Sequence, residues 1–395
     1  MGEFAVLEGD RLCIACGSKT FIPLAIPHPS RSMVSDGSLV SRALVRLSCA
    51  ACGHGSHLSP PTQEDLVDIY GKNYSLGLYD PKAERDRSLE YGRQLRSFLE
   101  AELGGLPIVG SIVEFGCGSG TLLGSLFKDF GARHATGIEP SSRLVAHARS
   151  NVGGEIEIHQ GFAERFDGTQ YDLCVSVNVI EHAQHPAAFL AASHRCVQPN
   201  GYILIVCPDG EIVSSELLFY DHISSFTMQS LRLLARANGL ALVGSRPLSD
   251  NLHGFRAYLF RRGEDDCESL SPDAAGLAAK RSEYLSAWGQ FENILGREIE
   301  GDAYAVFGTG EYADLLHAYS PSVIARAAYF VCDRPNADSR NGKRIVATDD
   351  FLASRPLPIV AAVHERNWFA VRDRFLSKGV SIMHPYELAR EGRLL

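Results

Sequence analysis

A glycine-rich turn near the middle of the chain constrains the fold more than any other segment. Residues 111–120 read Ser-Ile-Val-Glu-Phe-Gly-Cys-Gly-Ser-Gly, so a short apolar strand breaks at three glycines before a helical stretch begins at Thr121. Glycines let the backbone turn tightly out of a strand and leave room for a ligand against the main chain. A second apolar run, residues 135–138, ends in Glu139, 23 residues after Gly116. A carboxylate there can accept hydrogen bonds from both hydroxyls of a ribose, which predicts a nucleoside-binding α/β domain.

The spelling of this turn narrows the choice of ligand. Glu-Phe-Gly-Cys-Gly-Ser-Gly resembles the S-adenosylmethionine site of class I methyltransferases. NAD binding and a purely structural turn are the alternatives, since every dinucleotide fold shares a strand, a glycine turn and a helix. The cofactor contacts that we expect come from the turn and from the ends of the next three strands: Glu114, Gly116, Gly118, Gly120, Glu139, Phe162, Ala163 and Asn178.

Strand and helix patterns alternate through residues 106–262. Such alternation, with nearly continuous apolar strands, predicts a parallel sheet covered by helices on both faces. Ligands of these sheets bind at the carboxyl ends of the strands. The expected strands are 112–115, 135–138, 156–159, 173–177 and 202–206, the expected helices are 121–130, 141–151, 186–197 and 228–238, and two further strands are expected near 241–245 and 255–260.

Two Cys-x-x-Cys pairs stand near the N-terminus, Cys13 with Cys16 and Cys49 with Cys52, each followed by glycine. Paired knuckles of this kind suit a tetrahedral Zn²⁺ ion, and four thiolates leave it no open position. A segment of this size buries little core, so the metal would supply most of its folding free energy. We therefore expect a structural zinc-binding domain over residues 1–60, with redox dithiols as the alternative.

The remaining segments complete an α/β architecture. Residues 61–105 have a helical pattern and are expected to form a connector or lid, and residues 263–300 a linker with a helix. Residues 301–395 contain a second strand, glycine turn and helix, with Gly-x-Gly-x-x-Ala at 308–313 and an acid at Asp333. They predict a half-Rossmann-like domain for substrate docking or nucleotide binding. The expected order is thus zinc-binding domain, class I methyltransferase Rossmann-like domain and half-Rossmann-like domain.

Together these segments resemble the zinc-containing sugar C-methyltransferases of deoxysugar pathways. That family has the same order of domains, and the resemblance covers nearly the whole chain. The phrases that match are Gly137-Ile138-Glu139-Pro140, Asn178-Val179-Ile180-Glu181-His182, and Asp221-His222 ahead of Phe226.

The resemblance implies a chemistry. The family's substrate is a nucleotide-linked 4-keto-deoxysugar, and the methyl group goes to the carbon beside the ketone. By motif match the base that forms the enolate is His222, with Asp221 as its neighbour; imidazole suits this task near neutral pH. The side chains expected to hydrogen-bond the enolate oxygen are Tyr220, His182 and Tyr74. The alternatives are O- or N-methylation by the same base, a non-catalytic member of the family, and hydride transfer by the 303–333 unit.

Charge and hydropathy limit the partners. A formal net charge of −9 and the lack of a Lys/Arg block argue against a nucleic-acid-binding face. No apolar run approaches the roughly 20 residues that span a bilayer, and the N-terminus lacks a secretory pattern. We expect a cytoplasmic monomer or homodimer of several domains that acts on a small molecule, a nucleotide-linked sugar.

Overall fold

The computed structural model describes residues 7–8, 11–74, 81–168, 170–265, 273–298, 303–354, 356–384 and 387. The chain divides into two compact units, the first made of Met1–Pro23, Arg46–Leu217 and Asp221–Ala279, the second of Leu24–Val45, Leu218–Tyr220 and Lys280–Leu395. The glycine turn, the four cysteines of the knuckles, and both Asp221 and His222 belong to the first unit.

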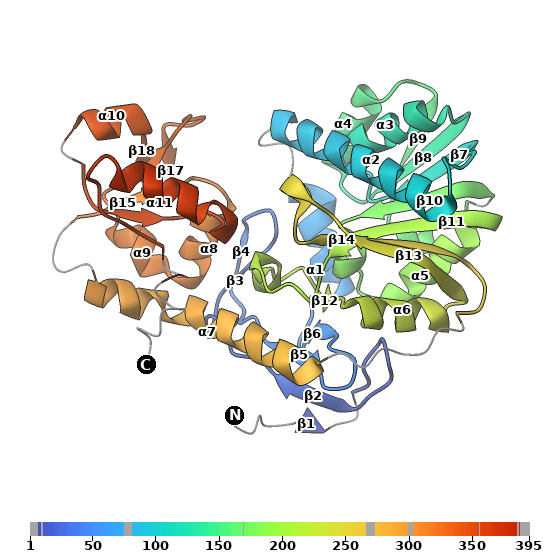
Figure 1. The fold of residues 1–395 in the computed structure, drawn as a ribbon, viewed down its shortest axis with the longest axis horizontal. Coiled ribbons are helices and arrows are strands. Elements are labelled where there is room, and N and C mark those ends of the chain that lie inside the picture. Colours follow the sequence, from blue (N-terminus) through green and yellow to red (C-terminus); the bar gives the residue numbers. More distant parts are fainter. Residues whose placement is uncertain are drawn as a thin grey trace. The chain divides into compact units, whose positions relative to one another are not determined.

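A seven-stranded sheet forms the centre of the first unit, in the order β13-β14-β11-β10-β7-β8-β9 (Figure 1). Strands β11, β10, β7, β8 and β9 run parallel, which confirms the predicted parallel sheet. β14 is antiparallel to both of its neighbours. It is antiparallel to β13 because the link between them, residues 248–254, is too short for the crossover that a parallel pair needs. The strands are β7 Ser111–Phe115, β8 His134–Glu139, β9 Ile156–Gln160, β10 Tyr171–Val177, β11 Val197–Pro208, β13 Leu240–Pro247 and β14 Phe255–Arg262.

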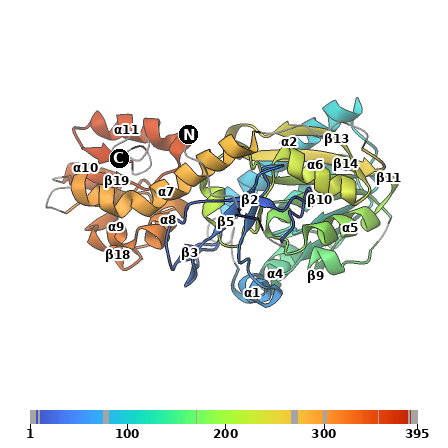
Figure 2. The same ribbon diagram turned by 90° about the horizontal axis from the view of Figure 1, so that it is seen from below.

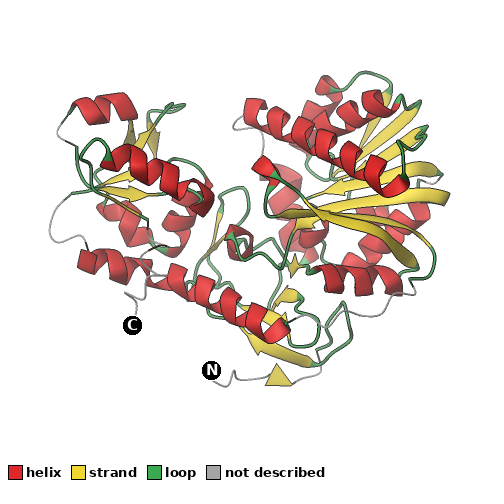
Figure 3. Cartoon of the chain, in the orientation of Figure 1, coloured by secondary structure: helices red, strands yellow, loops and turns green. Residues whose placement is uncertain are grey.

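Helices cover both faces of this sheet (Figure 3). Side chains alternate along β7, so that Ile112 packs with α2, α3 and α4, whereas Val113 and Phe115 pack with α5 and α6. Strands buried on both faces read as continuous apolar runs, and for that reason the sequence predicted them. The helices are α2 Pro81–Leu103, α3 Thr121–Phe130, α4 Ser142–Asn151, α5 Pro186–Cys196 and α6 Met228–Ala237.

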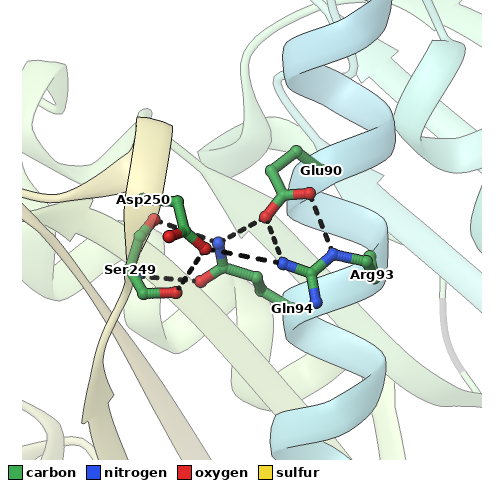
Figure 4. Close-up of polar contacts among 5 residues, drawn as sticks. All are labelled: Glu90, Arg93, Gln94, Ser249 and Asp250. Atoms are coloured by element: carbon green, nitrogen blue, oxygen red, sulfur yellow. Dashed lines mark hydrogen bonds and ion pairs between the residues drawn. The ribbon is translucent and has the colours of Figure 1, made fainter.

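Polar contacts tie α2 to the turn between β13 and β14 (Figure 4). Gln94 Nε2 donates to the carbonyl of Ser249 at 3.1 Å, and Ser249 N–H donates back to Gln94 Oε1 at 3.0 Å. Arg93, which is paired with Glu90 on the same helix, lies 3.9 Å from Asp250. These contacts fix the helix whose first turns reach the glycine turn.

The cysteine ribbon is a second, smaller sheet of the first unit, in the order β1-β2-β5-β6-β12. Its first four strands come from the N-terminal segment, whereas β12 comes directly after His222 in the sequence. The ribbon and the segment of the expected base therefore share one antiparallel sheet. The strands are β1 Leu7–Glu8, β2 Thr20–Pro23, β5 Arg46–Cys49, β6 Gly55–His57 and β12 Ser224–Ser225.

The second unit has its own sheet, in the order β17-β18-β16-β15-β19-β20. Strands β18, β16, β15, β19 and β20 run parallel, as expected for a half-Rossmann-like domain. Phe307 of β15 packs edge-to-face on Phe375 of α11, and Phe351 of α10 joins them. The two helices can be followed in Figure 2. The strands are β15 Ala305–Phe307, β16 Tyr329–Cys332, β17 Ser339–Arg340, β18 Lys343–Ala347, β19 Ile359–Ala361 and β20 Ile382–Met383.

The helices of the second unit are α8 Glu311–Tyr319, α9 Pro321–Arg326, α10 Thr348–Ala353 and α11 Trp368–Leu376, and α7, Ala274–Glu298, leads into them from the first unit. Asp333 is bonded to Thr348 and to Arg374. Across the described residues, the helices are all too short or too polar to cross a membrane.

Candidate active site

The glycine turn lies between β7 and α3 in a conformation that requires glycine. Gly116, Gly118 and Gly120 have φ of 72°, 51° and 75°. A Cβ on Gly116 would lie 2.3 Å from Cγ2 of Val179, so the next loop packs directly on the main chain there. At Gly118 a Cβ would meet nothing within 4 Å. The turn is therefore closed by packing at Gly116 and open to a ligand at Gly118.

Glu139, at the end of β8, is bonded to this turn. Its Oε2 accepts a hydrogen bond from Gly118 N at 3.1 Å, and its Oε1 accepts one from Ser141 N at 2.8 Å. Burial raises the pKa of Glu139 to about 7, against the opposing effect of these two N–H donors. Each carboxylate oxygen can accept a further hydrogen bond. The structure thus brings together two of the expected cofactor residues.

The other expected cofactor residues lie at the same edge of the sheet. Phe162 and Ala163 follow β9, where Gly161 N donates to the carbonyl of Glu139 at 3.0 Å. Asn178 follows β10 with φ of 56°, and its Nδ2 donates to Tyr91 Oη at 3.1 Å. Oδ1 of Asn178 is buried, and no described residue hydrogen-bonds to it.

Glu114 lies beneath the turn, on β7. It is buried, and its burial, followed by the charges of Glu139 and Glu84, raises its pKa well above the usual range. The helix α2 reaches the turn through Glu84, whose Oε1 accepts a hydrogen bond from Ser119 Oγ at 2.7 Å. This end of the sheet therefore combines backbone N–H groups with protonatable carboxyls.

Two histidines form a second group of polar side chains after β10 and β11. The rings of His182 and His222 meet edge to face, with 4.5 Å between centroids. Nδ1 of His182 lies 2.7 Å from Tyr70 Oη and 3.4 Å from Asp221 Oδ2, and Tyr70 Oη donates to the same Asp221 oxygen at 2.8 Å. Burial alone would lower the pKa of His182, but Asp221, together with Glu181, raises it to about 9. These two carboxylates therefore favour the cationic form of His182.

His222 is held by a different carboxylate. Its Nδ1 lies 3.0 Å from Oε2 of Glu216, in the short turn Ser215–Leu218. Burial alone would raise the pKa of Glu216, but His222, and after it Arg87, lowers it overall. His222 and Glu216 thus form an imidazole–carboxylate pair, while Asp221 directs its carboxylate to Tyr70 and His182.

The two expected tyrosines have different surroundings. Tyr74 packs edge-to-face on Tyr70 at 4.8 Å, and its carbonyl accepts a hydrogen bond from Ser141 Oγ at 3.4 Å. Tyr74 therefore borders both the histidines and the end of β8. Tyr220 belongs to the second compact unit, where its hydroxyl accepts a hydrogen bond from Arg42 at 3.3 Å.

The sequence analysis did not identify Tyr70, Glu181 and Glu216. Glu181 is 1% exposed, and neither of its carboxylate oxygens has a hydrogen-bond partner among the described residues. Burial raises its pKa, which the charges of His182 and His222 oppose. Donor atoms of Glu181, His182 and His222 lie within 4.8 Å of one another, a set that could hold a divalent ion. Glu181 stands in the matched Asn-Val-Ile-Glu-His phrase, whereas no sequence pattern marks Tyr70 or Glu216.

The four N-terminal cysteines form a compact cluster in the ribbon. Cys13 Sγ lies 3.7 Å from Cys52 Sγ, and Cys16 Sγ lies 3.6 Å from Cys49 Sγ. A tetrahedral Zn²⁺ ion with its usual bonds to sulfur separates thiolates by about 3.8 Å. The cluster therefore has the donors and the dimensions of a structural zinc site.

Comparisons with known proteins match the central part of the chain to methyltransferases. Residues 84–245 match the family described as "Methyltransferase domain". The ubiquinone biosynthesis O-methyltransferase of Dinoroseobacter shibae is 33% identical over 148 residues, which cover 35% of this chain and 56% of that protein. The ubiquinone biosynthesis O-methyltransferase of Aromatoleum aromaticum is 29% identical over 98 residues, 23% of this chain and 41% of that protein. The chain thus spans about half the length of these curated relatives.

The chain is also similar to solved structures of methyltransferases. A S-adenosylmethionine-dependent methyltransferase from Clostridium acetobutylicum aligns with 48% of this chain and 97% of its own, at 9% identity and a TM-score of 0.39. The match of residues 84–245 coincides with the glycine turn and most of the seven-stranded sheet. This chain contains a class I S-adenosylmethionine-dependent methyltransferase domain.

Proposed function

We propose that this protein transfers the methyl group of S-adenosylmethionine to an oxygen of a small-molecule acceptor. The observation that carries the proposal is the pair of imidazoles, one held by Glu216 and one by Asp221, in the same unit as the glycine turn. The names of the matched relatives, which are O-methyltransferases, favour oxygen as the nucleophile.

In this proposal the cofactor lies along the carboxyl ends of β7 to β10. Glu139 accepts hydrogen bonds from the ribose hydroxyls, and Gly118 gives the ligand access to the main chain. Phe162 and Ala163 border the adenine. Glu114 and Asn178 lie toward the methionine end, where the orphaned Oδ1 of Asn178 offers an acceptor to the ammonium group.

The two histidines have different roles in this proposal. His222 takes the proton of the acceptor hydroxyl, and Glu216 stabilises the imidazolium that results. The cation on His182 stabilises the negative charge that develops on the acceptor oxygen. Bound S-adenosylmethionine would supply the methyl group to the acceptor oxygen, and S-adenosylhomocysteine would be the by-product. Tyr74 borders the acceptor beside Tyr70.

A second candidate is methylation of a carbon next to a ketone, in a nucleotide-linked deoxysugar. The ribbon favours it, because a four-cysteine domain joined to an Asp-His motif is the arrangement that resembles the sugar C-methyltransferases. The same base would then remove a C–H proton, and His182 would stabilise an enolate. In either case we propose that Cys13, Cys16, Cys49 and Cys52 hold one structural Zn²⁺ ion.

A panel of acceptors with isotopically labelled S-adenosylmethionine tests the proposal. The panel contains phenols, hydroxy acids, nucleotide-linked sugars and nucleotide-linked 4-keto sugars, and mass spectrometry with NMR locates the new methyl group. O-methylation leaves every carbon-bound hydrogen of the acceptor in place, whereas C-methylation replaces one hydrogen on the carbon beside the ketone. A C-methyl product would replace the first candidate by the second, and label transfer to no member of the panel would count against both.

A further inference from the structure

We propose that the cysteine ribbon is a positioning device for the catalytic base, acting through Thr227 and Arg46. The inference rests on the proposed function, in which His222 accepts the acceptor proton. It concerns residues that lie outside the cofactor site and outside the histidine cluster, and it gives the ribbon a role in the rate of reaction as well as in folding.

The ribbon is paired with the chain directly after His222. Ser224 and Ser225 of β12 pair antiparallel with Ser56 and Gly55 of β6. His57 N also donates to the carbonyl of Ile223 at 3.3 Å. The main chain thus becomes part of the ribbon sheet two residues after the base, which leaves His222 little freedom to move away from it.

Thr227 joins this segment to a metal-ligand knuckle. The fully buried Oγ1 of Thr227 donates to the carbonyl of Cys52 at 2.9 Å and accepts from Ser230 N at 3.1 Å, as the N-cap of α6. Its methyl group packs on Gly53, where a Cβ would lie 3.2 Å from Thr227 Cγ2. One side chain therefore connects the second knuckle, the end of the β12 segment and the first turn of α6.

Arg46 holds the chain on the other side of His222. It belongs to β5, is 1% exposed, and its Nε donates to the carbonyl of Leu217 at 2.6 Å. Leu217 follows Glu216, the carboxylate partner of His222. The ribbon thus fixes the backbone beside both members of the imidazole–carboxylate pair.

This arrangement makes the geometry of the base depend on the ribbon. A general base must reach its proton within hydrogen-bond distance, and a displacement of about 1 Å can cost roughly 10²-fold in rate. The buried side chains of the ribbon pack into the core beneath the central sheet, and the metal proposed for its cysteines would add to this rigidity. Loosening the ribbon should therefore lower turnover without changing the cofactor site, which lies on other strands.

The test compares Thr227→Val with Thr227→Ser, and Arg46→Met with Arg46→Lys, in the full chain. Thr227→Val and Arg46→Met remove the hydrogen bond, whereas Thr227→Ser and Arg46→Lys keep a donor. Thr227→Val and Arg46→Met should lower kcat at least about tenfold. They should also speed amide exchange in peptides covering 216–227 while leaving the S-adenosylmethionine Kd within twofold. Thr227→Ser should restore kcat and protection. Thr136→Val is the matched control, because Thr136 is equally buried and bonded to Tyr171 but lies on β8.

The outcomes separate this inference from the proposed function. If Thr227→Val and Arg46→Met fold and keep wild-type kcat and protection, the ribbon does not position His222. If amide exchange rises at 216–227 but His222→Asn leaves turnover unchanged, the assignment of the base fails while the mechanical link stands. Equal losses of kcat in Thr136→Val would show general destabilisation and would also overturn the inference. If a variant does not fold, the zinc proposed for the four cysteines is removed from the wild-type chain with a chelator. Amide exchange at 216–227 should then rise, and unchanged exchange would overturn the inference.

Discussion

Glu139 is bonded to the glycine turn through Gly118 and to the start of α4 through Ser141. Replacing it with alanine removes the acceptors proposed for the ribose hydroxyls. Glu139→Ala should weaken S-adenosylmethionine binding by about 1–3 kcal/mol, the usual loss for charge-assisted hydrogen bonds. Isothermal titration calorimetry measures this change, with Glu157→Ala on the exposed side of β9 as the control. Unchanged affinity would remove Glu139 from the cofactor site.

The same residue predicts how cofactor binding depends on pH. Because burial raises the pKa of Glu139 to about 7, part of the free protein carries a neutral carboxyl at neutral pH. Two ribose hydroxyls stabilise the carboxylate form, so the bound state has the lower pKa. Affinity should therefore rise as the pH increases through about 7 and level off above it. The Glu139→Gln variant should lack this dependence, and a wild-type affinity that is flat from pH 6 to 8 would contradict the assignment.

At the scale of elements, the cysteine ribbon makes a prediction of its own. The Sγ–Sγ distances of 3.6 and 3.7 Å fit one tetrahedral ion, so metal analysis should find about one zinc per chain. Chelation should unfold the ribbon, seen as faster amide exchange at residues 46–57, before it affects β7 and β8. A folded protein without zinc would rule out the structural metal. A second bound metal would direct attention to Glu181, His182 and His222.

The predictable elements are those with local patterns. The strands of the central sheet are buried on both faces, so each is a continuous apolar run, and α3 was predicted at its observed bounds, Thr121–Phe130. The sequence did not predict β12, because a two-residue strand that pairs with β6 has no periodicity. Tyr70 and Glu216 were not predicted either, because their roles come from contacts with Asp221 and His222 that form only in the folded chain. Motifs identify the cofactor residues, whereas the partners of the histidines depend on tertiary structure.

At the scale of the whole molecule, the methyltransferase family match covers only the central part of the chain. Residues 84–245 match the family, while the four N-terminal strands of the cysteine ribbon and most of the second unit lie outside that match. Proteins that share a fold can act on different substrates, because specificity lies in the particular side chains around the site. We therefore expect acceptor specificity to depend on residues outside 84–245, and the panel of acceptors reports on it directly.

The most direct test of the central claim compares wild type with His222→Asn in a single-turnover assay at saturating labelled S-adenosylmethionine. His222→Asn keeps a polar side chain beside Glu216 but loses the proton-accepting imidazole. Methyl transfer should fall at least about 10²-fold in a protein that still folds and keeps its S-adenosylmethionine affinity, because a general base contributes about that factor. His253→Asn, at an exposed histidine, should behave as wild type. Methyl transfer by His222→Asn at close to the wild-type rate would contradict the account.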